Sequence, residues 1–395
     1  MPERRALTFA VTIRTTAPFG TSPAQFRGGR HAPGQSPGRA ERRGHVDRLR
    51  HAMIVSSAVQ GRTKGKPMKY VAVTRILDEA DIVEAFTRHT ALFAGHHIFI
   101  DNGSNDGTLD ILRSLQAEGL PITVFQNKSV HYNEREFNTF LYKEAVDNHR
   151  ADWVIFLDAD EFLDDRHLGM SFHQYFEALE RSGSPVQCVK IPMVNYQYTR
   201  QDNKDEMIVP RRMVKRHAPS DTCKVIVSAK IRHDEIMIDN GSHHVFCRGS
   251  EVREQITETR IWLAHYSERS PFQLVVKFVR GWAKVLAAGE VALKAGASSH
   301  YRGPFEILKD RPEALLKSEW FMTHKNEHPD LVEDPTRYHG GELRYTPRVE
   351  DDMIAVRSLM GYLADLAEQH GRLIDSSASV RQLVEQWGSQ HGRIL

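Results

Sequence analysis

Strand-like and helix-like hydrophobic patterns alternate along the chain from residue 69 onward. Short runs rich in β-branched and aromatic residues predict buried strands, and apolar residues three or four positions apart predict amphipathic helices. The predicted strands are Tyr70–Thr74, His97–Ile100, Ile122–Phe125 and Trp153–Leu157, and the predicted helices between them cover 78–93, 106–119 and Glu134–His149. This alternation predicts an α/β fold with a doubly wound, mostly parallel sheet and flanking helices, which binds ligands at the carboxyl ends of its strands.

The pattern becomes less regular after residue 165. Val186–Met193 and Lys224–Ile231 are the next predicted strands, and Ser270 followed by Pro271 is typical of a helix start. Beyond about residue 300 the pattern is irregular, and it becomes helical from about Asp351. We therefore expect a leader over 1–67, an α/β domain over 68–300 and a mostly helical C-terminal region over 301–395.

The first 67 residues differ from the rest in charge. They hold 13 of the 53 Lys and Arg residues but only 3 of the 51 acidic ones. They are also rich in Gly, Pro and Ser, a composition typical of disorder. An organelle-targeting presequence would have the same charge bias, and a translation start at Met53 or Met68 would leave this segment out altogether.

The remaining 328 residues carry 40 basic and 48 acidic side chains, which argues against nucleic acid as a partner because phosphate-backbone binding needs a basic face. No segment has the roughly 20 consecutive apolar residues of a membrane helix, and no signal-peptide core is evident. The three cysteines, Cys188, Cys223 and Cys247, are too far apart for a disulfide framework or a zinc cluster. A cytoplasmic protein is expected, with association at the membrane periphery left open.

Three acidic residues, Asp158, Asp160 and Glu161, follow the predicted strand Trp153–Leu157. Burying like charges without a partner is costly, so Asp158 and Asp160 at this strand end suggest a divalent cation. Hard oxygen ligands suit Mg²⁺ or Mn²⁺, which also bind phosphates. The alternative is that Asp158 caps the next element and Asp160 is solvated.

The sequence DNGSNDGT, Asp101 to Thr108, follows another predicted strand and begins a helix. Its small and Asx residues permit a tight turn, and free backbone N–H groups at the helix start suit an anionic or sugar-nucleotide ligand. An ordinary Asx-Gly turn would show the same residues.

Together, a first strand ending at Thr74, a second ending in DNGSNDGT and a fourth ending in DADEF resemble the sugar-nucleotide-binding half of glycosyltransferase family 2. The resemblance covers about residues 69–165 and extends weakly to about 285. Within the family, the resemblance is greatest to the branch whose N-terminal sequence is similar to Arg75 to Thr108 of this chain. It implies the GT-A fold and transfer of a sugar from a nucleoside diphosphate donor, with Mn²⁺ or Mg²⁺ as cofactor.

The same resemblance assigns candidate site residues. The donor-binding residues would be Thr74, Asp101, Asn102, Arg135 and Asp158, and the metal ligands would be Asp158, Asp160 and His265. The family's usual second Asp in the turn is Asn102 in this chain.

Other candidates for these roles are less distinctive in the sequence. His243 and His244 are alternatives to His265 as ligands or could face the acceptor. An inverting transfer needs a carboxylate base, for which Asp234 and Glu235 are candidates. Spacing does not separate those two from Asp202, Asp205, Glu206 and Asp239.

The leading hypothesis is a metal-dependent, inverting glycosyltransferase that uses a UDP- or GDP-linked sugar and a glycan or lipid-linked acceptor in polysaccharide or glycan assembly. One alternative is a non-catalytic nucleotide-sugar or glycan-binding module, since fold alone does not establish activity. The other is a phosphoaspartyl phosphatase, which also places Asp-x-Asp after an apolar strand.

Overall fold

In a computed structural model, the described residues are 67–131, 133–199, 201–231, 234–294, 296, 298–311, 330–348 and 351–388. The predicted leader, apart from Pro67, and the alternative start at Met53 lie outside them. The predicted domain boundary near residue 300 stays a prediction. No helix in the described part of the chain combines the length and the hydropathy needed to cross a bilayer.

Four parallel strands form the first half of the main sheet, in the spatial order β3-β2-β1-β4. They are β1 (Tyr70–Ile76), β2 (His96–Asp101), β3 (Ile122–Gln126) and β4 (Trp153–Phe156). The second half continues from β4 through β8 (Cys223–Ser228), β6 (Cys188–Asn195), β13 (Trp262–His265) and β5 (Glu161–Asp164), with β12 (Gln255–Thr257) also paired to β6. Because β8 and β5 are antiparallel to their neighbours, the sheet is mixed but mostly parallel.

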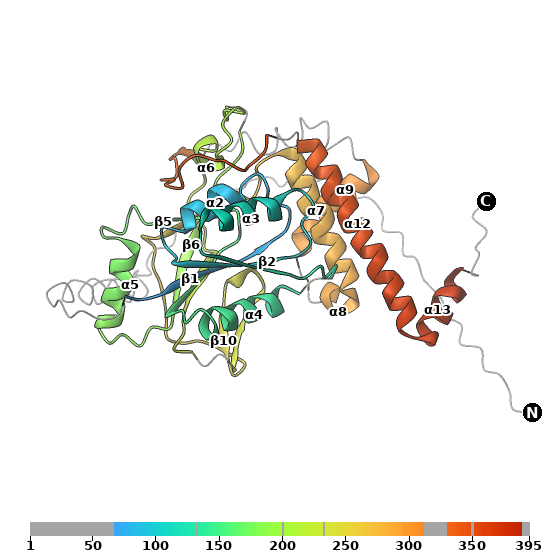
Figure 1. Cartoon of the computed structure of the whole chain (residues 1–395), viewed down its shortest axis with the longest axis horizontal. Coiled ribbons are helices and arrows are strands. Elements are labelled where there is room, and N and C mark those ends of the chain that lie inside the picture. The colour runs from blue at the N-terminus through green and yellow to red at the C-terminus, as the bar shows by residue number, and fades with distance from the viewer. Residues whose placement is uncertain are drawn as a thin grey trace, which may run out of the picture. The chain divides into compact units, whose positions relative to one another are not determined.

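Helices cover both faces of the parallel half, as the strand pattern requires. Successive residues of β1 point to opposite faces, so Ala72 packs in the same core as Phe86, while Val71 and Val73 pack with Leu141. The first face carries α2 (Val83–Thr90), α3 (Thr108–Glu118) and α5 (Phe172–Arg181), and the second carries α4 (Glu134–Asp147) (Figure 1). The predicted α/β fold, with flanking helices and a helical C-terminal region, is confirmed.

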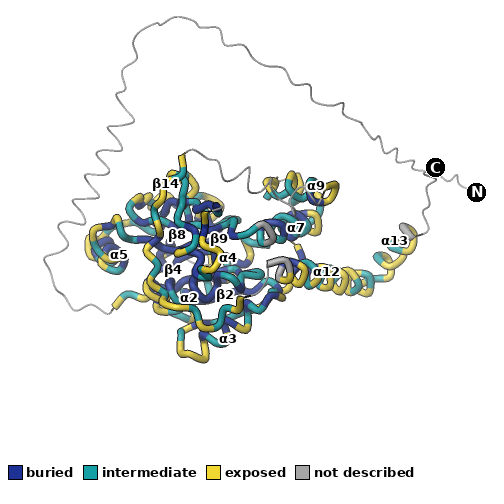
Figure 2. Tube along the Cα trace, turned by 90° about the horizontal axis from the view of Figure 1, so that it is seen from above, coloured by how far each residue is buried: buried dark blue, intermediate teal, exposed yellow. Residues whose placement is uncertain are grey.

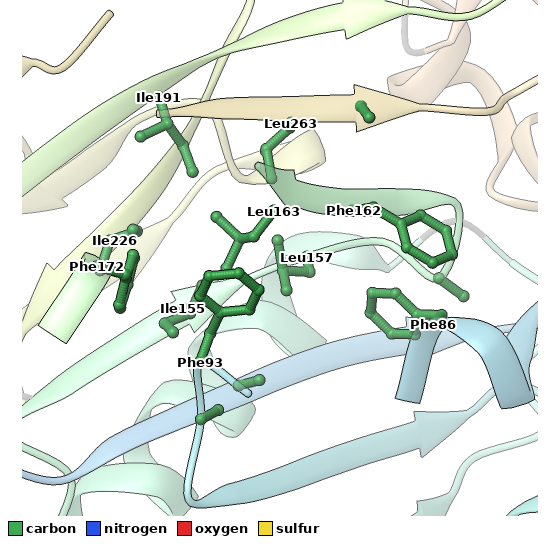
Figure 3. Close-up of a cluster of buried hydrophobic side chains, with 14 of the residues drawn as sticks. Phe86, Phe93, Ile155, Leu157, Phe162, Leu163, Phe172, Ile191, Ile226 and Leu263 are labelled. Carbon is green, nitrogen blue, oxygen red and sulfur yellow. The ribbon is translucent and has the colours of Figure 1, made fainter. Parts of the chain in front are cut away.

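The core on the first face is aromatic and draws on distant parts of the chain. The ring of Phe162 in β5 lies 5.8 Å from that of Phe86 in α2, centroid to centroid, in an edge-on contact (Figure 3). The ring centroid of Tyr266 is 5.5 Å from that of Phe162, again edge-on. Buried positions follow the strands of the sheet, whereas much of the outer surface of α12 is exposed (Figure 2). The ends of the strands are therefore fixed in position by a closely packed core.

Among the described residues that follow the main sheet in the sequence, three helices are longer than the others. They are α7 (Pro271–Ala287), α12 (Asp351–Ser376) and α13 (Ala378–Gly388), with the short α8 (Gly289–Lys294) after α7. Helix α12 runs beside α7 (Figure 1). It is also tied to the loop between β3 and α4, because the Tyr362 hydroxyl donates to the Val130 carbonyl at 3.0 Å and Gln369 Nε2 donates to the Lys128 carbonyl at 2.5 Å.

Small elements complete the structure. They are α6 (Val209–Arg212), β7 (Lys215–Arg216), β9 (Ile236–Ile238), the 3-10 helix η2 (Asn240–Ser242), β10 (Val245–Cys247), β11 (Ser250–Glu251), the 3-10 helix η3 (Ser299–Tyr301), α9 (Arg302–Asp310) and β14 (Val332–Glu333). The segment 330–348 contacts α2, since the buried Glu84 carboxylate accepts backbone N–H bonds from Arg344, Tyr345 and Thr346.

Two sequence expectations differ from the structure. Helix α2 begins at Val83 rather than Asp78, because Asp78 has φ of 55° and therefore cannot continue a right-handed helix. The stretch after residue 300, expected to be irregular, contains α9, whose buried Leu308 packs near Val275 of α7. Its apolar stripe is too short to stand out in the sequence.

Phe162→Ala should lower the free energy of unfolding by about 3–5 kcal/mol, because it removes a fully buried ring from the aromatic core. Urea unfolding monitored by circular dichroism would measure the change. Leu92→Ala is the control, since that side chain is 49% exposed and should change stability by less than about 0.5 kcal/mol. Equal effects of the two substitutions would contradict this description of the core.

Candidate active site

A cavity of about 250 Å³ opens at the carboxyl ends of β1 and β4. Its walls include the end of β1 and the loop after it (residues 75–79 and Asp81), the turn Asp158 to Asp160, one face of α7, and Ala355 and Ser358 of α12. Parallel strands present their carboxyl ends at one edge of the sheet, so this is where an α/β fold collects functional side chains. The C-terminal helices close the cavity from the side away from the sheet.

Asp158 lies between two cations. Its Oδ1 is 3.2 Å from Arg75 Nη2, and its Oδ2 accepts a hydrogen bond of 2.5 Å from Lys224 Nζ. Burial by itself would raise the pKa of Asp158, but the charges of Lys224 and Arg75 outweigh it and hold that pKa below its ordinary value. Asp158 is therefore ionised and already paired.

Asp160, Glu161 and His265 form a second group, whose ligand atoms all lie within 4.8 Å of one another. His265 Nε2 is 3.6 Å from Asp160 Oδ2, and the ring is oriented by a 2.7 Å hydrogen bond from His265 Nδ1 to Asn195 Oδ1. Such a bond at the far ring nitrogen is what usually positions a metal-binding histidine.

The residues of this group fit a divalent cation. Glu161 Oε1 is buried without a hydrogen-bond partner, although Lys224 Nζ lies 3.3 Å away. Burial raises the pKa of Glu161 to about 7, as expected for a carboxyl that lacks full compensation. Two carboxylates and one imidazole are ligands that Mn²⁺ and Mg²⁺ accept. The predicted ligands Asp160 and His265 come together here, while Asp158 lies outside the group and Glu161 takes its place.

Three cations line the cavity from α7: Lys277, Arg280 and Lys284, at i, i+3 and i+7 on one helical face. Lys277 Nζ lies 3.4 Å from Asp160 Oδ2. Burial by itself would raise the pKa of Asp160, but Lys277 and His265 outweigh it and hold that pKa well below its usual range. The sequence analysis did not identify these residues. Their i, i+3, i+7 spacing on the helix predicted to start at Ser270 would have placed them on one face.

Arg280 joins the two halves of the cavity wall. Its Nη1 contacts the carboxylate of Asp78 in the loop after β1 and donates a 2.6 Å hydrogen bond to Ser358 Oγ of α12. Next to it, Gly281 leaves room for Tyr301, because a Cβ at that position would lie 2.5 Å from a ring carbon of Tyr301. A side chain at position 281 would therefore displace Tyr301 from the cavity wall.

The sequence profile of the family described as "Glycosyl transferase family 2" matches residues 96–239. The resemblance to glycosyltransferase family 2 is confirmed. The matched segment runs from the start of β2 to the residue before η2, and so includes Asp158, Asp160 and Glu161. No curated protein sequence matches the chain.

Solved structures of glycosyltransferases resemble the chain at low identity. A mannosyltransferase from Pyrobaculum calidifontis in complex with GDP-Man and Mn²⁺ is 11% identical, with a TM-score of 0.30, over 82% of this chain and 95% of that one. Glucosyl-3-phosphoglycerate synthase from Mycobacterium tuberculosis, in complex with Mn²⁺, UDP-Glc and phosphoglyceric acid, is 18% identical, with a TM-score of 0.21. That match covers 41% of this chain and 49% of the synthase, and another complex of the synthase holds Mg²⁺ and UDP.

The donor-binding residues inferred from the family 2 resemblance lie in different environments. Asn102 and Asp158 line the cavity. Asp101 is fully buried, and its carboxylate accepts bonds from the backbone N–H groups of Gly103 and Ser104. Thr74 is buried and bonded to His97, and Arg135 is exposed on α4. None of these last three lines the cavity.

The remaining candidates also lie outside the cavity wall. Glu235 Oε1 accepts a 2.6 Å bond from Arg248 Nε, and its neighbour Asp234 is exposed. His243 Nδ1 is 2.8 Å from the Cys223 carbonyl oxygen. His244 Nδ1 is 2.8 Å from Glu251 Oε1.

Lys224→Met should lower the free energy of unfolding by about 3–5 kcal/mol, since Asp158 and Glu161 would lose the cation they share. Adding Glu161→Gln should restore part of the loss by removing one unpaired carboxylate. Urea unfolding would measure both. Lys230→Met is the control, because that half-exposed pair with Glu180 contributes about 1 kcal/mol at most. A double variant no more stable than Lys224→Met would contradict the assignment.

Acid should destabilise the protein through His97. Burial lowers the pKa of His97 to about 3, whereas an unfolded histidine titrates near 6.5. The unfolded state therefore binds the extra proton first, and stability present above about pH 6.5 is lost as the pH falls toward 3. Between pH 6.5 and 4.5 the wild type should lose about 2 kcal/mol more than His97→Gln. Unfolding at each pH, with the exposed His131→Gln as control, tests this; parallel pH profiles would refute it.

Proposed function

We propose that this protein is a metal-dependent glycosyltransferase that transfers a sugar, with inversion, from a UDP- or GDP-linked donor to a glycan or lipid-linked acceptor. The observation that carries the proposal is the position of Asp160, which belongs to the group with Glu161 and His265 and also lines the cavity, beside Lys277 on the cationic face of α7. A nucleoside diphosphate is an anion that such a combination suits. The family 2 match across residues 96–239 supports the same class of reaction.

Asp160, Glu161 and His265 would hold Mn²⁺ or Mg²⁺, with Asp158 close enough in sequence to act as a further ligand. When bound, the ion would neutralise the negative charge that develops on the departing nucleoside diphosphate. Lys224 and Arg75 keep Asp158 ionised without any ion, so the turn keeps its shape before the donor arrives. Lys277 adds a positive charge beside Asp160 from the opposite wall.

The donor would lie along the cavity between β1 and α7. Asn102, at the end of β2, lines this space and is fixed by two hydrogen bonds that its Nδ2 donates to the carbonyls of Asn127 and Ser129. Asp101 would not contact the donor. It would fix the shape of the turn by accepting hydrogen bonds from the backbone N–H groups of Gly103 and Ser104. Thr74 and Arg135 would need to act through neighbours, since neither lines the cavity.

An inverting transfer needs a carboxylate that removes the proton of the acceptor hydroxyl. We place this base among three of the carboxylates that line the cavity, Glu79, Asp81 and Glu134, and so in place of Asp234 and Glu235, which do not line it. Burial raises the pKa of Glu79 to about 8, which favours its protonated form, whereas Arg75 offsets burial and keeps the pKa of Glu134 low. Activity in glycan assembly, in the cytoplasm or at the membrane periphery, belongs to the same proposal.

Asp160→Asn should abolish metal-dependent nucleotide binding, because it removes a charged oxygen from the ligand group. Isothermal titration of the full chain with UDP, GDP, UDP-Glc and GDP-Man, each with and without Mn²⁺, would measure it. The wild type should bind one nucleotide series at least tenfold more tightly with Mn²⁺. Asp221→Asn, an exposed loop substitution, is the matched control.

The same titrations, with donor hydrolysis and transfer measured in parallel, distinguish a glycosyltransferase from a non-catalytic binding module and from a phosphoaspartyl phosphatase. Metal-dependent binding without turnover for any acceptor would favour a binding module. No binding by the wild type to any of these nucleotides would refute the donor site, and trapping of a phosphate mimic at Asp158 would then favour the phosphatase.

A further inference from the structure

Most cations around the cavity have a carboxylate partner. Arg75 pairs with Glu134 and Asp158, Lys224 with Asp158 and Glu161, Arg269 with Glu79 and Asp81, Lys277 with Asp160, and Arg280 with Asp78. Lys284 differs. Among the described residues, its ammonium has no carboxylate within ion-pair distance, and its hydrogen bond goes to the neutral amide oxygen Asn102 Oδ1.

The position of Lys284 is fixed by the fold. It lies on α7 two helical turns after Lys277, about 10 Å along the axis, and on the same face. Asn102 presents its oxygen to Lys284 because its Nδ2 is already used by the carbonyls of Asn127 and Ser129. The contact between Lys284 Nζ and Asn102 Oδ1 is therefore fixed by the position of each residue, and both residues line the cavity.

The charges near Lys284 do not neutralise it. The two acids whose charges act on it, Glu134 and Asp101, are already paired with Arg75 and with backbone N–H groups respectively. Burial, reinforced by the charge of Arg280, lowers the pKa of Lys284 to about 7. An enclosed ammonium with only a neutral acceptor is costly, and an anion beside it would remove that cost.

We propose that Lys284, with Asn102 as its anchor, binds a phosphoryl oxygen at the end of the cavity away from Lys277. This inference deepens the proposed function and rests on it for the source of the phosphoryl group. A sugar hydroxyl would leave the ammonium uncompensated, whereas a phosphoryl oxygen brings the missing negative charge and accepts a charge-assisted hydrogen bond. The group belongs either to the donor nucleotide or to a phosphorylated acceptor.

Titration of Lys284→Met against wild type would test the site. The probes are UDP, GDP, UMP, uridine and guanosine with Mn²⁺, and inorganic phosphate alone and in competition with each nucleotide. We expect the substitution to weaken binding of phosphate-bearing probes about tenfold or more and to leave the nucleosides unchanged. Lys284→Arg should retain most of the affinity, since it keeps the charge.

Lys294→Met is the matched control, because Lys294 is an exposed lysine on the neighbouring α8 whose partner is Glu290. It should bind every probe as the wild type does. Circular dichroism checks that each variant is folded. If the Lys284→Met variant does not fold, Lys284→Gln provides a second neutral substitution.

Loss of nucleotide affinity would assign the phosphoryl group to the donor. Loss confined to inorganic phosphate would assign it to an acceptor. Unchanged affinity for every phosphate-bearing probe, or an equal loss for uridine and guanosine, would overturn the inference. If the wild type binds no nucleotide but binds inorganic phosphate through Lys284, the proposed function fails and the phosphoryl site stands; if it binds neither, both fail.

Discussion

The electrostatic repulsion among three carboxylates in four residues is the constraint around which this site is organised. Asp158, Asp160 and Glu161 follow a buried strand directly, where water cannot fully screen them. Their compensation comes from elements that are distant in sequence: Arg75 of β1, Lys224 of β8, His265 of β13 and Lys277 of α7. Each pairing requires its element to be in register with the β4–β5 turn, so the charges and the sheet order depend on one another.

This dependence explains the arrangement of the second half of the sheet. Strand β8 lies antiparallel to β4, and Lys224 near its start is thereby brought to the carboxyl end of β4 beside Asp158. Strand β13 pairs antiparallel with β5, opposing His265 to Glu161. Residues that are far apart in the chain thus become neighbours through strand pairing.

The sequence predicts what depends on local pattern. The four parallel strands, α3, α4, α7 and the acidic turn follow from periodicity. Asp160 and His265 lie close together, while their role as metal ligands stays a prediction. The partners of the acidic turn were not predictable, because nothing local to Lys224 indicates that β8 inserts beside β4. Glu161 was not expected beside Asp160 and His265, since its orientation depends on β5 turning back to pair with β13. The predicted start of α2 was too early, because Asp78 has a left-handed backbone conformation and its carboxylate pairs with Arg280 in the cavity wall.

The position of Ser358 and Arg280 has a consequence for how the protein is made. The sheet and its acidic turn are encoded before residue 266, but the wall opposite them needs α7 and then α12, which begins at Asp351. Contacts such as Ser358 with Asp78 span 280 residues. During synthesis the sheet domain can emerge and fold first. We infer that the nascent chain leaves the ribosome with the Asp160, Glu161 and His265 group formed but with the cavity open on one side, and that the cavity is enclosed only once the last helices have docked.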